Sequence, residues 1–214
     1  MRCALSRPDI VLAIDTSAAH CAAALLFGTH EPGRKETLRI VSRSEDMAKG
    51  QAERLPGLVD AVLRDGRVKL ADITLLAVGV GPGNFTGIRI AVAYTRGLAL
   101  GLGVPAKGVT TFEAVAMHSG AKPFPYWVVM DAPRAEIYAQ RFPQGTACIL
   151  TSSVQESLDA PVLHRNELGP DALVRAIAEH AYHTPTDAHA RPAPFYLRAA
   201  DAAPSSDPPP VILP

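Results

Sequence analysis

The sequence predicts a mixed α/β fold, and three observations support this prediction. Apolar runs of strand length alternate with segments in which apolar residues recur at helical spacing. Residues 73–80 are apolar nearly throughout, as expected of a central strand covered on both faces. Two apolar runs that end in Asp15 and Asp131 are each followed by a short turn and a second apolar run. This echo suggests a duplicated α/β unit in two lobes, but the general likeness of any two β-hairpins explains it equally well.

The first third of the chain predicts three strands and a helix. Residues 10–14 and 21–27 form an antiparallel pair around a tight turn, and residues 38–42 form a third strand. Residues 51–64 change to helical spacing, with one apolar stripe made of Leu55, Leu58, Val59, Val62 and Leu63. Because proline lacks an N–H, Pro56 is expected in the first turn, so the regular helix should begin near Leu55.

The remaining elements continue the alternation. The strand at 73–80 runs into a glycine-rich loop at 81–87, and a long helix follows at about 86–102. Further strands are predicted at 104–109, 126–130 and 136–142, a short helix capped by Thr111 ends at Met117, and a last helix covers 170–183. The predicted domains are a first lobe at 1–110, a smaller second lobe at 111–198 and a proline-rich tail at 199–214.

The long helix predicts a contact with another subunit. One side is a broad apolar stripe, and another side carries Ala93, Gly97 and Gly101, small residues that let a second helix come close. Simple burial in the chain's own core is the alternative. The candidate interface residues lie on this helix and on the stripe at 55–63: Leu55, Leu58, Val59, Val62, Ile88, Ala91, Val92, Thr95, Gly97, Leu98 and Gly101.

Composition excludes several classes of protein. The 214 residues are 48% hydrophobic, enough for a core, and 21 basic residues balance 21 acidic ones. A protein that grips nucleic acid by itself usually carries a surplus of positive charge, so direct RNA binding is not expected. Three cysteines without a CxxC pair, no signal peptide and no apolar span predict a soluble cytoplasmic protein that makes no membrane contact.

A phosphate or nucleotide site is conceivable where the first strand and the glycine-rich loop end. Its candidate residues are Asp15, Thr16, Ser17, Gly81, Gly83 and Asn84. The loop is neither a Walker A loop nor a dinucleotide fingerprint, and a purely geometric role for its glycines is favoured over phosphate binding. The turn after Asp131 contains Pro133 and offers no second phosphate loop, so ATP turnover by this chain alone is not expected. No metal site is predicted from the scattered histidines.

Three motifs together resemble the TsaB (YeaZ) family of bacterial tRNA threonylcarbamoyladenosine biosynthesis proteins. The most specific motif joins the loop to the long helix, and Phe85, Thr86, Gly87 and Arg89 belong to it. The full set is Ile14-Asp15-Thr16-Ser17, then Gly81-Pro82-Gly83-Asn84-Phe85-Thr86-Gly87-Ile88-Arg89, then Asp131-Ala132 followed by Glu136-Ile137-Tyr138. Tyr196-Leu197-Arg198 also fits, so the resemblance covers residues 10 to about 198.

This resemblance implies an actin-like (ASKHA) fold of two lobes with a reduced second lobe. It also implies a non-catalytic partner of a TsaD-type subunit, working with a TsaE-type ATPase. The TsaD-type subunit transfers threonylcarbamoyl to N6 of adenosine 37 in tRNAs that read codons beginning with A. The first-lobe helices would form a heterodimer with that subunit, or a homodimer when the chain is alone, and tRNA would be contacted mostly through the complex.

No cofactor of its own is implied for the chain, and any ATP is expected at the interface with the partner. The sequence departs from the family where Gln51 replaces a frequent histidine, and where Pro133 and Ala135 replace arginine and glycine. Two alternatives remain from the residues themselves. One is a stand-alone nucleotide-binding protein or weak ATPase of the same fold, and the other is a metalloprotease-like protein, for which the ligand motif is missing.

Overall fold

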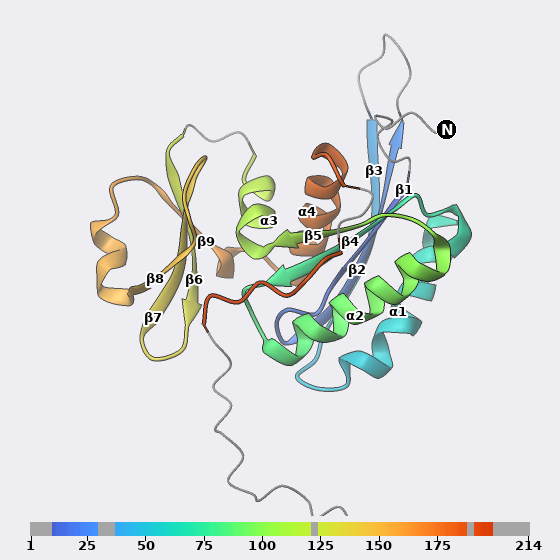
Figure 1. Ribbon diagram of the computed structural model, residues 1–214, viewed down its shortest axis with the longest axis horizontal. Coiled ribbons are helices and arrows are strands. Elements are labelled where there is room, and N and C mark those ends of the chain that lie inside the picture. Colours follow the sequence, from blue (N-terminus) through green and yellow to red (C-terminus); the bar gives the residue numbers. More distant parts are fainter. Residues whose placement is uncertain (1–9, 30–36, 121–123, 188–190, 199–214) are drawn as a thin grey trace, which may run out of the picture.

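The computed structural model describes residues 10–29, 37–120, 124–187 and 191–198, and the predicted tail at 199–214 lies outside them. Two β-sheets stand apart with two helices between them, and two further helices cover the outer face of the larger sheet (Figure 1). The predicted α/β fold is therefore confirmed. The larger sheet contains β1 (Ile10–Asp15), β2 (His20–Thr29), β3 (Thr37–Asp46), β4 (Leu75–Gly81) and β5 (Ala106–Thr110).

The order of strands in the larger sheet is β3-β2-β1-β4-β5. The first three strands form an antiparallel meander, whereas β4 and β5 run parallel to β1. Side chains alternate along β1, where Val11 and Ala13 face one core and Leu12 and Ile14 face the other. Both faces of this sheet are therefore buried, which explains why its central strands are continuous apolar runs.

The smaller sheet repeats this topology with one strand fewer. It contains β6 (Tyr126–Ala132), β7 (Glu136–Phe142), β8 (Cys148–Thr151) and β9 (Val162–His164), in the order β8-β7-β6-β9. Again the first three strands form an antiparallel meander and the next strand is parallel to the first of them. The shared order supports the duplicated unit, and no counterpart of β5 occurs in the described part of this sheet. The prediction of a reduced second lobe is thus confirmed.

Two helices lie on each face of the larger sheet. The outer pair is α1 (Gln51–Gly66) and α2 (Phe85–Leu102), and the pair between the sheets is α3 (Thr111–His118) and α4 (Pro170–His183). Short 3-10 turns complete the chain, as η1 (Leu70–Asp72), η2 (Ser152–Ser157) and η3 (Arg165–Glu167). The predicted boundary at residue 110 separates the strands of the two sheets. It does not separate two packing units, because α4, which follows the boundary, packs against β1, β2 and β3 of the larger sheet.

Two helix starts differ from the sequence prediction. The first helix begins at Gln51, and Pro56 lies inside it rather than in its first turn. Both Pro56 and Ala52, whose carbonyl loses its helical partner, are exposed, so water can satisfy that carbonyl. Thr110, not Thr111, caps α3, because its Oγ1 accepts a hydrogen bond from Glu113 N and the Glu113 carboxylate accepts one from Thr110 N in return.

Candidate functional site

The glycine-rich loop packs directly on the turn that follows β1. Thr16 Oγ1 donates a hydrogen bond to the Gly87 carbonyl at 2.6 Å, and Asn84 N donates one to the Ser17 carbonyl at 2.6 Å. A methyl group on Gly83 or Gly87 would collide with the carbonyl oxygen of Ser17 or Thr16. Gly81 has a φ of 95°, in the left-handed region. These contacts support the geometric role favoured for the glycines, because backbone of the same chain occupies the space beside Gly83 and Gly87.

The residue that precedes α2 satisfies one of the N–H groups in the first turn of the helix. Asn84 Oδ1 accepts a hydrogen bond from Gly87 N at 2.8 Å and caps the helix. The backbone N–H of Asn84 is bound to Ser17 as described above. A phosphate that used either of these two N–H groups would have to displace its contact within the chain.

Asp15 lies beneath this contact and is 1% exposed. Its Oδ2 accepts a hydrogen bond from Ser17 Oγ at 3.0 Å and lies 2.6 Å from His20 Nε2, while its buried Oδ1 has no hydrogen-bond partner. Gly79 on β4 leaves room for that oxygen, since a methyl group there would collide with it. The structure thus brings Asp15, Thr16 and Ser17 together with the loop, as the sequence suggested, but it seals the carboxylate inside the chain.

The corresponding turn of the smaller sheet is open. The Asp131 side chain is 70% exposed and accepts a hydrogen bond from Asn166 Nδ2 at 2.6 Å, with His164 Nε2 at 3.4 Å from its other oxygen. Glu136 forms an ion pair with Arg198, and Tyr138 packs half-buried against the core between the sheets. Asp131 thus contacts β9 through His164, and Glu136 contacts the C-terminal segment through Arg198.

The C-terminal segment 191–198 crosses from one sheet to the other. Phe195 N donates a hydrogen bond to the Val80 carbonyl at 2.8 Å, and the Tyr196 ring stacks on Phe85 with centroids 5.0 Å apart. The Arg89 guanidinium lies 3.7 Å from the Phe85 ring centroid and donates from Nε to the Tyr196 hydroxyl at 2.9 Å. Together with the Arg198 ion pair, these contacts give Phe85 and Arg89 a structural role. The segment joins α2 and β4 to the smaller sheet.

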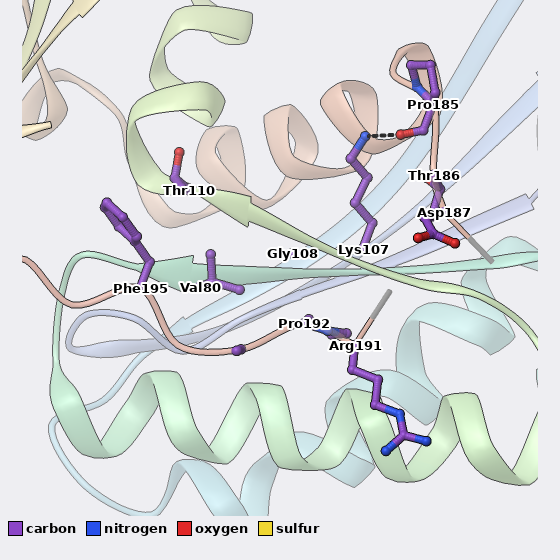
Figure 2. Close-up of a pocket in the computed structure, with 11 residues that line it drawn as sticks. Val80, Lys107, Gly108, Thr110, Pro185, Thr186, Asp187, Arg191, Pro192 and Phe195 are labelled. Carbon is purple, nitrogen blue, oxygen red and sulfur yellow. Dashed lines mark hydrogen bonds between the residues drawn. The ribbon is translucent and has the colours of Figure 1, made fainter. Parts of the chain in front are cut away.

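A cavity of about 400 Å³ lies between β4, β5 and the C-terminal segment (Figure 2). Sequence reasoning did not find it, because its walls come from distant parts of the chain. Lys107 Nζ donates to the Pro185 carbonyl at 2.9 Å and to Thr184 Oγ1, and burial lowers the pKa of Lys107. Arg191 points away from this lysine in Figure 2. The partly buried Lys107 amine is thus bound to the chain itself and offers little to a ligand.

Most of the predicted interface residues belong to the chain's own core. They are 4% exposed or less and pack between the larger sheet and its outer helices: Leu55, Leu58, Val59, Val62, Ile88, Ala91, Val92 and Thr95. In this structure they are core residues, because the apolar stripes of α1 and α2 cover the sheet rather than a partner. Gly97 and Gly101 are exposed with no atom near the position of an added side chain, and Leu98 is half-buried.

One exposed apolar residue on α2 was missed. Leu100 is 88% exposed, and it falls on the same helix face as Ala93, Gly97 and Gly101. Its spacing from Gly97 and Ala93 was the available signal. We call these four residues the α2 outer face. Leucine exposed to this degree beside two glycines is a surface that the described part of the chain leaves uncovered.

Gln51, the potential metal ligands and the helices can be described directly for the residues that the structure covers. Gln51 is nearly buried and its Nε2 donates to the Met47 carbonyl at 3.1 Å, so its amide is used within the chain. No group of three or more His, Cys, Asp or Glu side chains in the described ranges could hold a metal ion. Among the helices so described, none has the length and apolar character needed to cross a membrane.

Comparison with known proteins connects this arrangement to a family. The model of the TsaD family, tRNA N6-adenosine threonylcarbamoyltransferase, matches residues 43–195. TsaB of Buchnera aphidicola is 30% identical over 152 residues, which cover 70% of this chain and 68% of that protein. An uncharacterized protein of Mycobacterium tuberculosis is 32% identical over 200 residues, covering 92% and 87% of the two chains.

A solved structure agrees with the sequence matches. YeaZ from Pseudomonas aeruginosa superposes with a TM-score of 0.67 at 25% identity, covering 88% of this chain and all of that one. The superposition and the TsaD-type match both indicate the actin-like fold that the duplicated sheets display. The chain therefore belongs to the TsaB (YeaZ) family of tRNA threonylcarbamoyladenosine biosynthesis proteins.

Proposed function

We propose that this chain is a non-catalytic subunit of the machinery that makes threonylcarbamoyladenosine in tRNA. Its partner is a TsaD-type subunit, which transfers the threonylcarbamoyl group to N6 of adenosine 37 in tRNAs that read codons beginning with A. A TsaE-type ATPase works with the pair, and any ATP is bound where the two subunits meet. In the absence of the partner, the chain forms a homodimer.

The observation that carries this proposal is the closed contact between the β1 turn and the glycine-rich loop. A phosphate site needs free N–H groups and room for the anion, but here the N–H groups of Asn84 and Gly87 are bound within the chain and the carbonyls of Thr16 and Ser17 occupy the room beside Gly87 and Gly83. The smaller sheet adds only the short turn after Asp131, without a glycine-rich loop. These features favour a chain that keeps the fold without turning over nucleotide.

The α2 outer face is the surface proposed to meet the partner. Glycine inside an exposed helix costs about 1 kcal/mol relative to alanine, and no described atom lies within 4 Å of the position that a side chain on Gly97 or Gly101 would take. Small residues let two helix backbones approach, and Leu100 supplies apolar area for burial. A partner helix packed on this face explains why two glycines and an exposed leucine share it.

Reconstitution of tRNA modification tests the function. The purified TsaD-type subunit, the TsaE-type ATPase and a threonylcarbamoyl-adenylate synthase are incubated with unmodified tRNA, with or without this chain, and the modified nucleoside is measured by mass spectrometry. We expect modification only when the chain is present, and neither modification nor ATP hydrolysis by the chain alone. Full modification without the chain contradicts the proposal, and ATP hydrolysis by the isolated chain supports the weak-ATPase alternative instead.

A further inference from the structure

We propose that a cluster of exposed basic residues at the C-terminal end of α1 contacts the phosphate backbone of RNA. The basic cluster consists of Arg39, Arg43, Arg64, Arg67 and Lys69, all of which are exposed. The inference rests on the proposed function, because that function makes tRNA the RNA in question. It adds to that function a direct role for this chain in holding the substrate.

The fold assembles the basic cluster from two parts of the chain. Arg39 on β3 donates from Nη2 to the Gly66 carbonyl at 3.5 Å, and its guanidinium lies 3.8 Å from the ring centroid of Phe27. Arg43, on the same strand, donates from Nε to the Asp65 carboxylate at 2.5 Å. Both strand side chains therefore meet the end of the helix, where Arg64 and Arg67 stand. Neutral overall composition hides this local accumulation of charge.

The nearby carboxylates offset only part of this charge, because three of them stand beside five cations. Asp65 is engaged by Arg43, which with Arg64 lowers the pKa of Asp65. Asp72 accepts a hydrogen bond from Lys69 N at 2.8 Å as part of the cap of η1, and Asp60 is exposed one turn before Arg64. Within the described ranges, the structure records no ion pair for the side chains of Arg64, Arg67 or Lys69. These three cations are available to an external anion.

Arg67 stands at a position where the backbone favours glycine. It ends α1 with φ 60° and ψ 39°, in the left-handed region that strains residues with a side chain. Its backbone N–H donates to the Arg64 carbonyl, a bond that glycine would form equally well. Arg64 already places a positive charge in the last turn, where it balances the helix dipole. The fold therefore gains little from an arginine at 67, and its side chain points to a function outside the fold.

A polyanion fits the basic cluster better than a protein surface. Protein interfaces usually centre on apolar and aromatic side chains, but none of the exposed large apolar residues described for this chain belongs to the cluster. Arginine binds phosphate through paired N–H groups and is the residue preferred for backbone contacts in nucleic-acid recognition. Exposed, wet and positively charged surfaces are typical of such contacts.

Binding of unmodified tRNA to the assembled complex with the TsaD-type subunit tests the inference. The test variant combines Arg64→Gln, Arg67→Gly and Lys69→Gln. A control variant removes three exposed cations elsewhere, through Lys49→Gln, Arg175→Gln and Arg191→Gln. Affinity is measured over a series of salt concentrations, because each phosphate contact adds about 1 to the slope of log K against log salt.

We expect the test variant to weaken tRNA binding about tenfold or more and to lower the salt slope by about 2 to 3, whereas the control leaves both nearly unchanged. Equal affinity and slope for the two variants overturn the inference, and so does a wild-type complex without measurable tRNA affinity. Arg67→Gly alone should raise the melting temperature and still weaken binding, which separates recognition from folding.

Co-purification with the TsaD-type subunit distinguishes the two proposals. If the wild-type chain pairs and supports modification while the test variant binds tRNA like the control, only the inference about the basic cluster fails. If the test variant folds but no longer pairs, the cluster is a protein contact and the inference is wrong. If the wild-type chain itself does not pair, the proposed function fails.

Discussion

The two sheets share one strand order but differ in what surrounds their first strand. In the larger sheet, β1 ends in a buried aspartate under a glycine-rich loop, and helices cover both faces. In the smaller sheet, β6 ends in an exposed turn, and only the 3-10 turn η2 lies between its third and fourth strands. The C-terminal segment pairs with the start of β7 through Arg198 and Glu136. The comparison shows that the two sheets share one topology although only the larger one has a glycine-rich loop packed on the turn after its first strand.

The largest expected effect lies at the closed loop. Gly87→Val places a side chain against the Thr16 carbonyl, so we expect the free energy of unfolding to fall by about 3 kcal/mol. Gly97→Ala, in the same helix but facing open space, should instead raise it by about 1 kcal/mol. Urea denaturation of both variants measures the difference. Wild-type stability for Gly87→Val would mean that the loop is not clamped as described.

The two aspartates provide the next test. Asp15→Ala removes the partner of buried His20 and Ser17, and should lower the free energy of unfolding by about 2 kcal/mol. Asp131→Ala acts at an exposed site and should change it by no more than about 0.5 kcal/mol. Thermal and urea unfolding give both values. Equal losses of stability in the two variants would contradict the distinction between the buried turn after β1 and the exposed turn after β6.

The C-terminal segment gives a smaller effect that should be confined to the smaller sheet. A double-mutant cycle with Glu136→Gln and Arg198→Met should yield a coupling of about 1 kcal/mol, as expected of a partly buried ion pair. Amide hydrogen exchange should become faster in β7 of the single variants and stay unchanged in β1. A uniform change across both sheets would contradict a tether that acts locally.

The smallest effect is a pH dependence that arises between the sheets. Burial lowers the pKa of His180 below its usual value of about 6.5, although Glu113 at 3.8 Å works in the opposite direction. The unfolded chain therefore takes up a proton at higher pH than the folded chain does. The His180 contribution to stability is complete above pH about 6.5 and falls below it, by at most about 1.4 kcal/mol per pH unit.

His180→Gln should remove this part of the acid sensitivity. Unfolding measured between pH 7.5 and about 5.5 should give a flatter profile for the variant than for the wild type. An unchanged profile would show that other groups cause the loss of stability in acid.

Sequence reasoning found nearly all elements and the duplicated fold, because periodicity and apolar runs report directly on strands and helices. It placed the α1 and α2 stripes at a subunit interface, whereas residues such as Leu58 and Ile88 cover the chain's own sheet. Periodicity shows which face of a helix is apolar but not what covers that face. The sequence also did not show that Leu100 would be left exposed, because periodicity does not say which apolar side chains lack a neighbour.

The parts of the site that depend on distant residues could not be predicted. The sequence indicated that Gly83 and Gly87 allow a close approach, but only the structure shows that the Ser17 and Thr16 carbonyls fill the gap. The convergence of Arg39 with Arg67 follows from the pairing of β3 with the rest of the sheet and the return of α1 across it. A local sequence pattern does not predict that residues this far apart in the chain will be neighbours in space.

The central claim is that the chain acts by pairing through the α2 outer face, and the mass of the complex tests it most directly. Gly97→Leu adds bulk on that face, and Gly169→Leu adds the same bulk at another open glycine, at the start of α4. After mixing with the TsaD-type subunit, native mass spectrometry should show a heterodimer for the wild type and Gly169→Leu, and separate subunits for folded Gly97→Leu. A heterodimer formed equally well by Gly97→Leu would contradict the account.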